Sequence, residues 1–417
     1  MNATEMKRQT VPNSGDSVQH RFAQSSEGLS SSEIRDLMSL ASASDIISFA
    51  GGMPGNELFP LDEMDRIYNN LTESEKQTAL QYGPTSGIPS LLESLTSYLE
   101  TKGLPVKENR LLITTGSLQA IHILARAFID PGDRVLVENP SFIGALSAFR
   151  ACQAELRAIP LRGDGMDMSL LAKELNSASP QPKFLYYAPN FHNPAGIIYS
   201  MEVKQQMIAL LRGRNIPVIE DDVYSDIWFD EKDLPEMMNL KAMNPEGIDI
   251  CFTGSFSKIL GPGLRLGWML VPEAIYRKCE LIKQSIDACS PSLSQVLADK
   301  FIRSGEIYRY TARIREEYKN RGETMIATLE EHLPEYVTFE RPRGGFYTWL
   351  QLPKGTDTTI ILKRAIEKGV VFVTGKTFDP AGVQNDHMRV SFCNTDAATI
   401  RRGIPLIAQA IREIIEK

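Results

Sequence analysis

The sequence predicts an α/β fold with a mostly parallel sheet, joined to a smaller α+β domain. Two observations carry this prediction. From about residue 111 to about residue 271, short apolar runs typical of strands alternate with longer amphipathic segments typical of helices. Beyond Pro291 the pattern changes to long helices that are interrupted by two strand-like runs. At 417 residues the chain is long enough for about two or three domains with ample cores.

The first region supplies the elements of the predicted sheet. Each apolar run ends in a polar loop, and in open α/β sheets ligands bind outside the carboxyl ends of the strands. We therefore expect a ligand site built from these loops. Strands are predicted at 111–115, 134–137, 183–188, 216–219, 250–253 and 264–271, and helices at 118–129, 169–175 and 203–214.

The second region combines helices with fewer strands. A long helix over 306–333, charged on one face, is followed by a strand at 345–350, a helix near 359–368, a strand at 388–392 and a terminal helix. The expected domains are a flexible N-terminal arm over 1–25, a large α/β domain over 61–294, and a small α+β domain formed by 26–60 and 295–417.

Composition excludes several classes of partner. A net charge of −7 makes nucleic acid and anionic membranes poor partners. The chain contains no apolar run of about 18 residues, so we expect no membrane span. The first 24 residues lack the apolar segment of a secretion signal. The five cysteines are scattered without C-x-x-C pairing, which indicates free thiols in a reducing cytoplasm. The five histidines show no metal-ligand spacing.

The segment 254–268 carries the clearest chemical signal. Lys258 lies in a loop between two apolar strands, with Ser255 three residues before it and Arg265 seven residues after it. A lysine amine can form a Schiff base with an aldehyde. A hydroxyl and a guanidinium can bind a phosphate dianion. Together they fit an aldehyde that carries a phosphate, and pyridoxal 5'-phosphate (PLP) is the cofactor with both groups.

Two other interpretations of this segment are weaker. Ser-x-x-Lys also occurs in class A β-lactamases and penicillin-binding proteins, but these also need S-D-N and K-T-G, and the chain has neither. A solvated lysine in a glycine-rich turn is the usual fate of a single lysine. Loops held between buried strands, however, are where catalytic groups concentrate.

Eight short motifs follow one another along the chain: FAGGMP at 49–54, LQYGP at 80–84, TGS at 115–117, NPSF at 139–142, PNFHNPAG at 189–196, EDDVY at 220–224, the Lys258 segment, and HMRVS at 387–391. In this order they resemble the fold-type I PLP-dependent aminotransferases of class I/II. The subgroup that the chain is most similar to contains 2-aminoadipate (LysN-type) and kynurenine aminotransferases. The similarity runs from about Ser31 to the C-terminus.

The resemblance implies the phosphate end of a cofactor site. Gly116 and Ser117 lie where a strand passes into a helix, so that backbone N–H groups and the serine hydroxyl can bind phosphate. Ser255 and Arg265 complete this cradle. Tyr82 is expected to reach the phosphate of a neighbouring subunit, which implies a homodimer with shared active sites.

The resemblance also implies the groups around the cofactor ring. Phe142 is expected to stack on the ring, while Asn193 and Tyr224 bind its phenolic oxygen. The ring nitrogen needs a carboxylate partner to stay protonated. Asp221 has the family spacing of three residues before Tyr224. Strict strand alternation instead groups Asp222 with Tyr224, so that both carboxylates remain candidates.

The substrate is expected to bind next to Lys258, the implied catalytic residue. Arg389, in an apolar strand, is expected to hold the substrate α-carboxylate in a bidentate pair. Asn193 is expected to contribute to the same site, and Gly51 and Gly52 leave room for the substrate.

Arg35 is a further candidate, for the distal part of the substrate. The segment 31–35 resembles an N-terminal segment whose arginine reads that part in the subgroup. The competing interpretation is a surface arginine paired with Glu33 or Asp36.

Taken together, the resemblance implies an aminotransferase with a ping-pong cycle. An L-amino acid of the 2-aminoadipate, glutamate, aromatic or branched-chain type donates the amino group, and 2-oxoglutarate accepts it. A PLP-dependent lyase or decarboxylase shares the same cofactor site and is the alternative. A MocR-like regulator needs a basic N-terminal winged-helix domain. Fewer than about 35 residues, most of them polar, precede the region that resembles the aminotransferases, and such a domain would not fit in them.

Overall fold

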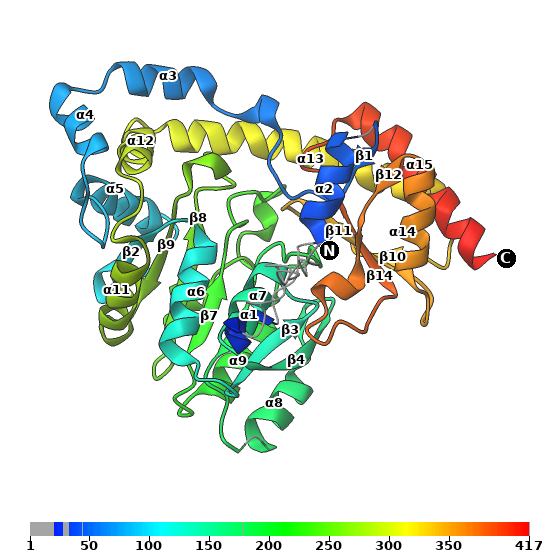
Figure 1. Cartoon of the computed structure of the whole chain (residues 1–417), viewed down its shortest axis with the longest axis horizontal. Coiled ribbons are helices and arrows are strands. Elements are labelled where there is room, and N and C mark those ends of the chain that lie inside the picture. Colours follow the sequence, from blue (N-terminus) through cyan, green and yellow to red (C-terminus); the bar gives the residue numbers. More distant parts are fainter. Residues whose placement is uncertain (1–20, 28–32, 44, 178, 417) are drawn as a thin grey trace, which may run out of the picture.

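A sheet of eight strands forms the centre of the larger part of the molecule (Figure 1). The structure is a computed structural model that describes residues 21–27, 33–43, 45–177 and 179–416. In the order in which they lie side by side, the strands are β2 (Arg110–Thr114), β9 (Gly267–Val271), β8 (Ile250–Ser255), β7 (Val218–Asp221), β6 (Leu185–Tyr187), β3 (Arg134–Asn139), β4 (Glu155–Arg162) and β5 (Gly165–Met166).

The sheet is mostly parallel, as predicted. The neighbours β8, β7, β6, β3 and β4 all run in the same direction. The strand β9 is antiparallel to both β2 and β8, and β5 is antiparallel to β4. Asp221 at the end of β7 is in register with Thr253 on β8. The loops that follow these two strands therefore start at the same edge of the sheet.

Helices cover both faces of this sheet. Along β6, Tyr186 belongs to the core cluster on one face, whereas Leu185 and Tyr187 belong to the cluster on the other, which is the alternation that a strand imposes. The first cluster includes residues of α6 (Ser117–Phe128), α7 (Ile143–Ala151) and α11 (Glu273–Asp287). The second includes residues of α8 (Met168–Ser177), α9 (Met201–Leu211) and α10 (Leu240–Met243).

A third group of helices packs beside the antiparallel end of the sheet. It consists of α3 (Leu61–Asn69), α4 (Glu73–Leu80), α5 (Pro89–Glu100) and α12 (Ser292–Arg303), and α12 contacts the other three. Thr72 fixes the start of α4, because its hydroxyl accepts the Glu75 N–H while the Glu75 carboxylate accepts the Thr72 N–H.

The smaller part of the molecule contains two further sheets and lies at the right of Figure 1. Four antiparallel strands are ordered β10 (Thr338–Phe339), β11 (Tyr347–Gln351), β14 (His387–Ser391) and β13 (Val373–Thr374). The parallel pair is β1 (Ile47–Ser48) and β12 (Val370–Val371). Their core includes residues of α2 (Glu33–Ala43), α13 (Glu306–His332), α14 (Thr358–Glu367) and α15 (Ala397–Ile415).

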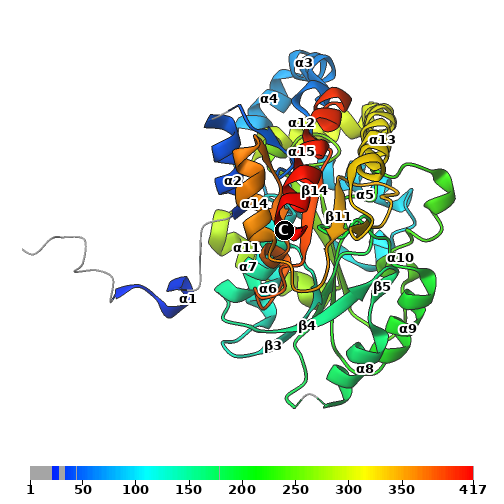
Figure 2. The ribbon, with the colours of Figure 1, turned by 90° about the vertical axis from the view of Figure 1, so that its right-hand side faces the viewer.

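Segments from both ends of the chain share this smaller core. Leu37 of α2 and Phe49 belong to the same buried cluster as Ile361 of α14 and Ile404 of α15. Both views place α2 in the same part of the molecule as α14 and α15 (Figures 1 and 2). Within the described residues, the remaining elements with assigned bounds are α1 (Gln24–Glu27) and the 3-10 helices at Asn56–Leu58, Val106–Glu108, Glu231–Asp233, Pro262–Leu264 and Gly375–Phe378.

Some boundaries differ from the prediction. The strand predicted over 264–271 begins only at Gly267, because Pro262–Leu264 form a 3-10 helix. Strand β4 is missing from the prediction, since Pro160 within it lowers the strand signal. The proposed domain border between residues 294 and 295 falls inside α12, and the division into domains stays a proposal. In the described part of the chain, no helix is long and apolar enough to cross a membrane.

Candidate active site

The predicted site residues gather where the loops after the large sheet meet the small sheet. Asn193 follows β6, Tyr224 follows β7 and Lys258 follows β8, whereas Gly116 lies between β2 and α6. Arg389 is in β14 of the small sheet, and its guanidinium donates to the Asn193 side chain over 2.7 Å. This contact joins the two parts of the molecule at the predicted site.

The Lys258 amine lies in an enclosed and partly aromatic environment. It donates to the Gly52 carbonyl over 2.9 Å and lies 5.6 Å from the ring centre of Tyr224 and 5.5 Å from that of Phe346. Burial lowers the pKa of the Lys258 amine from its usual 10.5 to about 8, and the positive charge of Arg389 contributes in the same direction. At pH 7 roughly a tenth of this amine is therefore neutral and nucleophilic, about 300-fold more than for an ordinary lysine.

Arg389 is a buried cation held by neutral acceptors. It is 1% exposed, and it donates to Asn193 and to the Ala50 carbonyl, the latter over 2.6 Å. Its Nε has no hydrogen-bond partner, and among the described residues no carboxylate pairs with it. The guanidinium lies 4.2 Å from the ring centre of Tyr347 and 4.9 Å from that of Phe378. A buried cation without a counter-charge fits the carboxylate of a ligand.

The two candidate carboxylates are held by different groups. Asp221 accepts from the hydroxyls of Tyr186, over 2.9 Å, and Thr253, over 2.8 Å. Burial raises the pKa of Asp221 to about 6, against the effect of these two hydrogen bonds. None of the described lysines and arginines forms an ion pair with it. A cationic partner, such as a protonated ring nitrogen, fits this carboxylate.

Asp222 has a different set of partners. It accepts from the Asn190 and Asn239 side chains and from the Ser225 N–H. Because β7 ends at Asp221, strand alternation does not continue to Tyr224. The alternation argument that grouped Asp222 with Tyr224 therefore loses its structural basis.

The loops at the start of α6 and around β9 form a tight cradle. Gly116 has φ +84°, and Ser117 is the first residue of α6. A Cβ added at Gly267 would lie 2.6 Å from the Ser117 nitrogen, so that glycine is required at this position. Ser255 is the register partner of Gly267 on β8. The exposed first turn of a helix with a nearby serine hydroxyl fits a phosphate group.

Arg265 stands at the same cradle in a strained conformation. Its φ is +53°, in the left-handed region that non-glycine residues rarely adopt, and such strain is concentrated at functional sites. Its guanidinium donates to the carbonyls of Pro262 and Thr115, and a Cβ at Gly116 would lie 3.0 Å from it. None of the described carboxylates pairs with Arg265, which leaves its charge for an anion.

Phe142 directly precedes α7, and Tyr224 follows β7. A Cβ at Gly144 would lie 2.6 Å from the Phe142 ring, so this ring is packed over the start of α7. The Tyr224 hydroxyl is 3.0 Å from that of Tyr347. Tyr347 was not among the predicted site residues. Its contact with Tyr224 joins residues 123 apart in the sequence, and no local pattern indicates it.

A buried network holds the loop that carries Asn193. The Glu138 carboxylate accepts from the Tyr199 hydroxyl over 2.6 Å, from the His192 Nε2 over 3.1 Å and from the Ala188 N–H. His192 Nδ1 accepts from the Ala195 N–H, so that Nε2 carries the ring proton. Glu138 and His192 are also additions to the predicted site, although both lie in or beside its motifs.

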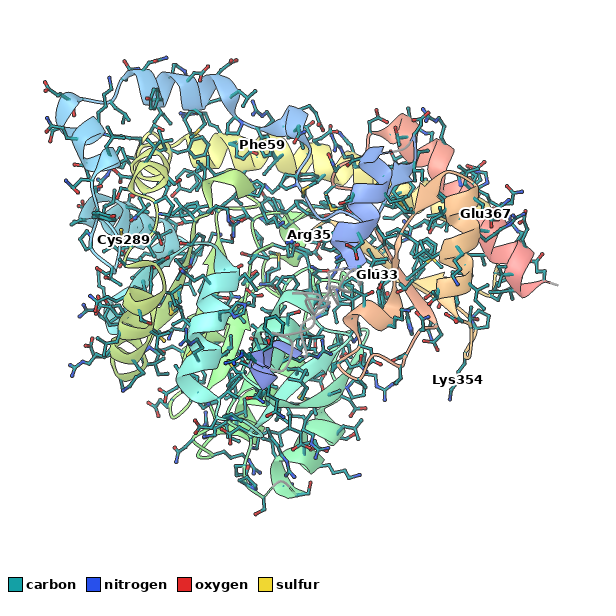
Figure 3. All side chains as sticks on the ribbon, viewed as in Figure 1. Glu33, Arg35, Phe59, Cys289, Lys354 and Glu367 are labelled. Carbon is teal, nitrogen blue, oxygen red and sulfur yellow. The ribbon has the colours of Figure 1, made fainter. Side chains whose placement is uncertain are left out.

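Two of the predicted site residues, Arg35 and Tyr82, are exposed. Arg35 is exposed near the start of α2 (Figure 3). The Glu33 carboxylate accepts from the hydroxyls of Thr374 and Thr377 rather than from Arg35. Tyr82 is 86% exposed.

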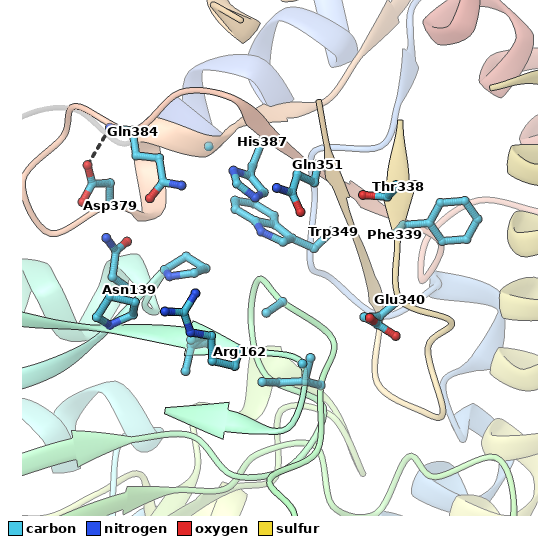
Figure 4. Close-up of a pocket in the computed structure, with 17 residues that line it drawn as sticks. Asn139, Arg162, Thr338, Phe339, Glu340, Trp349, Gln351, Asp379, Gln384 and His387 are labelled. Atoms are coloured by element: carbon cyan, nitrogen blue, oxygen red, sulfur yellow. Dashed lines mark hydrogen bonds between the residues drawn. The ribbon is translucent and has the colours of Figure 1, made fainter. Parts of the chain in front are cut away.

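A separate cavity of about 420 Å³ lies between the ends of β3 and β4 and the small sheet (Figure 4). Its walls include Asn139, Arg162, Trp349 and His387, and the last two rings are stacked at 5.3 Å. None of the predicted cofactor or substrate residues lines this cavity. The residues around Lys258 are therefore candidates because of their chemistry and not because they line this cavity.

Comparison with known proteins agrees with this chemistry. The family model described as aminotransferase class I and II matches residues 55–407. Aromatic-amino-acid aminotransferase 1 of Thermococcus litoralis is 35% identical over 400 residues, which cover 95% of each chain.

Two solved structures are similar along nearly the whole chain. The kynurenine aminotransferase of Pyrococcus horikoshii is 35% identical with a TM-score of 0.92, covering 96% of this chain and 99% of the other. LysN, the α-aminoadipate aminotransferase of Thermus thermophilus, was solved with N-(5'-phosphopyridoxyl)-L-leucine. It is 30% identical with a TM-score of 0.86, covering 95% of this chain and 98% of the other.

Proposed function

The chain belongs to the class I and II aminotransferases and transfers amino groups with PLP as its cofactor, and from that premise we propose which of its residues perform the reaction. One observation carries the proposal. The Lys258 amine and the buried Arg389 guanidinium lie within each other's field, and neither of them nor the buried Asp221 carboxylate has an oppositely charged partner among the described residues. Such an arrangement is costly for the fold alone, and it fits a ligand that bears an aldehyde, a carboxylate and a basic ring nitrogen.

Lys258 is the proposed catalytic residue. PLP, when bound, supplies an aldehyde and a ring that accepts electrons. The neutral Lys258 amine attacks a carbonyl carbon readily, because only the unprotonated nitrogen has a free electron pair. Once the substrate amine displaces it, Lys258 Nζ would take the proton from the substrate α-carbon and deliver it to the C4' carbon of the cofactor within the same half-reaction. With the 2-oxo acid in the second half of the cycle, the same nitrogen would move the proton in the reverse direction.

The other residues position the reactants. Arg389 binds the substrate α-carboxylate with its planar pair of N–H donors. Asp221 holds a proton on the ring nitrogen, and Tyr224 with Asn193 binds the phenolic oxygen. The phosphate-binding residues are Gly116, Ser117, Ser255 and Arg265. The ring is covered by Phe142, and Gly52 borders the substrate.

The first prediction concerns the pH dependence of cofactor attachment. When PLP is added to the cofactor-free protein, the rate at which visible absorbance appears should rise with pH and reach half of its plateau near pH 8. This follows because burial sets the pKa of Lys258 at about 8. An ordinary lysine has a pKa of about 10.4, and its rate would still increase steeply at that pH. Stopped-flow absorbance measures this rate.

Lys258→Ala should remove this rise of visible absorbance after the addition of PLP, which we call the fast phase. The matched control is Lys204→Met, because burial lowers the pKa of Lys204 to about 8 as well, while its amine donates to the Glu236 carbonyl away from the site. A fast phase that persists in Lys258→Ala would contradict the central assignment.

The second prediction separates the two carboxylates. Asp221→Asn should lower kcat by roughly 30-fold or more, since it removes a charged hydrogen bond of about 2 kcal/mol to the ring nitrogen. Asp222→Asn should retain kcat within a few-fold. It should instead lower the free energy of unfolding, because its new amide would face the N–H donors of Asn190, Asn239 and Ser225. Steady-state kinetics and urea unfolding measure the two effects. The reverse pattern would assign the role to Asp222.

We propose L-amino acids of the 2-aminoadipate, glutamate, aromatic or branched-chain type as donors and 2-oxoglutarate as acceptor. The aromatic-amino-acid, kynurenine and α-aminoadipate aminotransferases to which the chain is similar support this range of donors. The position of α2 supports a role for Arg35 in reading the distal part of the substrate. Met38 lies 3.6 Å from the Cβ position of Gly51, and Arg35, three residues earlier, lies on the same side of the helix.

The third prediction tests this role. Arg35→Gln should lower kcat/KM for glutamate and 2-aminoadipate by roughly 5- to 30-fold, or about 1–2 kcal/mol, since it removes a charged contact to the distal carboxylate. The values for leucine and phenylalanine should remain unchanged, and Arg35→Lys should retain part of the discrimination. Steady-state kinetics on this panel of donors measure the effect. An equal loss of kcat/KM for all four donors would show that Arg35 does not bind the distal carboxylate.

We further propose a homodimer in which Tyr82 completes the partner's phosphate site. Leu80 and Tyr82 are 88% and 86% exposed, and their segment is tied to α12 by the Ser292 hydroxyl, which donates to the Gln81 carbonyl. Two other exposed apolar side chains, Met53 and Leu118, are the sequence neighbours of Gly52 and Ser117. A two-fold axis can place Leu80 and Tyr82 of one copy over the exposed surface that Met53 and Leu118 form on the other copy.

The fourth prediction follows from this arrangement. Sedimentation equilibrium should give twice the chain mass, and Leu80→Asp should shift the protein toward monomer and weaken PLP binding. Tyr82→Phe should remain dimeric and lose PLP affinity by roughly 5- to 30-fold, the effect of one hydrogen bond to a charged group. A monomer with full PLP affinity would contradict the shared site.

A further inference from the structure

Tyr347 connects three groups of the site. Its hydroxyl is 3.0 Å from the Tyr224 hydroxyl, and its ring centre is 4.2 Å from the Arg389 guanidinium. A Cβ added at Gly52 would overlap the Tyr347 hydroxyl, and the Gly52 carbonyl accepts from Lys258. Tyr347 is 2% exposed, and its ring meets that of Tyr224 nearly at a right angle. Its position is therefore fixed on several sides.

The two hydroxyl groups, of Tyr224 and Tyr347, share one hydrogen bond. Burial raises the pKa of both phenols, so each keeps its hydrogen at neutral pH. Within the described residues, each of the two hydroxyls has only the other as a hydrogen-bond partner. One hydrogen must therefore lie between the two oxygens, while the other points elsewhere. The direction of the bond decides which tyrosine keeps a hydrogen for a ligand.

The surroundings favour Tyr347 as the donor. The charge of Arg389 makes both phenols more acidic, but its guanidinium lies over the Tyr347 ring, where its effect is the largest after burial, and the more acidic phenol is the better donor. The close packing against Gly52 leaves no space for an acceptor on that side of the Tyr347 hydroxyl. The other titratable groups that face the pair are Lys258, the Tyr186 phenol and the Cys393 thiol, and burial raises the pKa of this phenol and of this thiol, which keeps both neutral.

We propose that Tyr347 is a positioning residue that donates its hydroxyl hydrogen to Tyr224, leaving the Tyr224 hydrogen for the phenolic oxygen of the cofactor, while its ring supports the Arg389 guanidinium. The inference rests on the functions proposed above for Tyr224 and Arg389. The hydroxyl and the ring thus have separate roles. The hydroxyl acts on the cofactor through Tyr224, and the ring acts on the substrate carboxylate through Arg389.

The hydroxyl is tested on the cofactor-loaded protein without substrate, by the pH at which its visible absorbance changes as Lys258 Nζ loses its proton. A hydrogen bond from Tyr224 to the phenolic oxygen draws charge from that oxygen and weakens its hold on this proton. Tyr347→Phe should therefore raise the pH midpoint, by roughly half a unit to one unit. Tyr224→Phe should raise it at least as much. The double variant should match Tyr224→Phe, because Tyr347 acts only through Tyr224.

The matched control is Tyr276→Phe, which removes a phenol hydroxyl that donates to Glu280 on the outer helix α11 and should leave the midpoint unchanged. A midpoint that moves in Tyr224→Phe but not in Tyr347→Phe overturns the inference and leaves the proposed function intact. Additive shifts in the double variant overturn it as well. A midpoint that Tyr224→Phe does not move overturns the proposed role of Tyr224, and the inference with it.

Two further measurements complete the test. A fluorotyrosine introduced at position 347 retains the shape of the residue and makes its hydroxyl a stronger donor, so the midpoint should fall; this arm decides the matter if Tyr347→Phe does not fold. For the ring, Tyr347→Leu should raise KM for amino donors roughly 5-fold relative to Tyr347→Phe, since it removes the contact with the Arg389 guanidinium. Equal KM values would overturn the role of the ring.

Discussion

The enclosure of charged groups without opposite charges is the constraint on which this site depends. Lys258 and Arg389 are both cations, they lie within each other's field, and neutral carbonyls accept their hydrogen bonds. Asp221 has only hydroxyl partners. Removing such groups from water destabilises the folded chain, so the surrounding fold has to compensate. The compensation comes from the clusters on both faces of the large sheet and from the core of the small one. The lowered pKa of the Lys258 amine is a direct consequence, because the burial that costs stability also disfavours the charged form of the amine.

Neutral networks around the charges keep them in place. Glu138 receives three donors from the stretch between Ala188 and Tyr199, and this holds the loop on which Asn193 meets Arg389. The network is rigid because each polar atom in it has a defined role as donor or acceptor. On the opposite side, the close approach of Gly267 to the first residue of α6 fixes the cradle. Positions of this kind explain why small residues and buried polar residues recur beside the reactive ones.

The sequence indicated the candidate residues whose neighbours along the chain already suggest their chemistry, and it gave no sign of those that matter only through contacts between distant segments. Lys258, Ser255 and Arg265 lie in one segment whose spacing already indicates their chemistry, and the order of strands and helices predicted the sheet that presents them. Tyr347 lies in a strand that has no unusual pattern, and its importance arises only where it meets Tyr224. The sequence left both Asp221 and Asp222 as candidates, because the strand-alternation argument depends on where β7 ends. Sequence patterns do not locate the end of a strand to within one residue. Strand β4 was missed because its proline lies in a position where only the tertiary neighbours reveal a strand.

The segment 49–52 shows how the two parts of the molecule act on one site. Its backbone joins the small core, since the Phe49 N–H donates to Val371 and the Phe49 carbonyl accepts from Ser391. The same segment offers its Ala50 carbonyl to Arg389 and its Gly52 carbonyl to Lys258. These carbonyls are neutral, so a carboxylate competes well for the guanidinium, and an aldehyde takes the amine away from Gly52 by forming a covalent bond. Binding of the ligands would therefore change the contacts that this segment makes with both cations, which couples the substrate side of the site to its cofactor side through one short stretch of backbone.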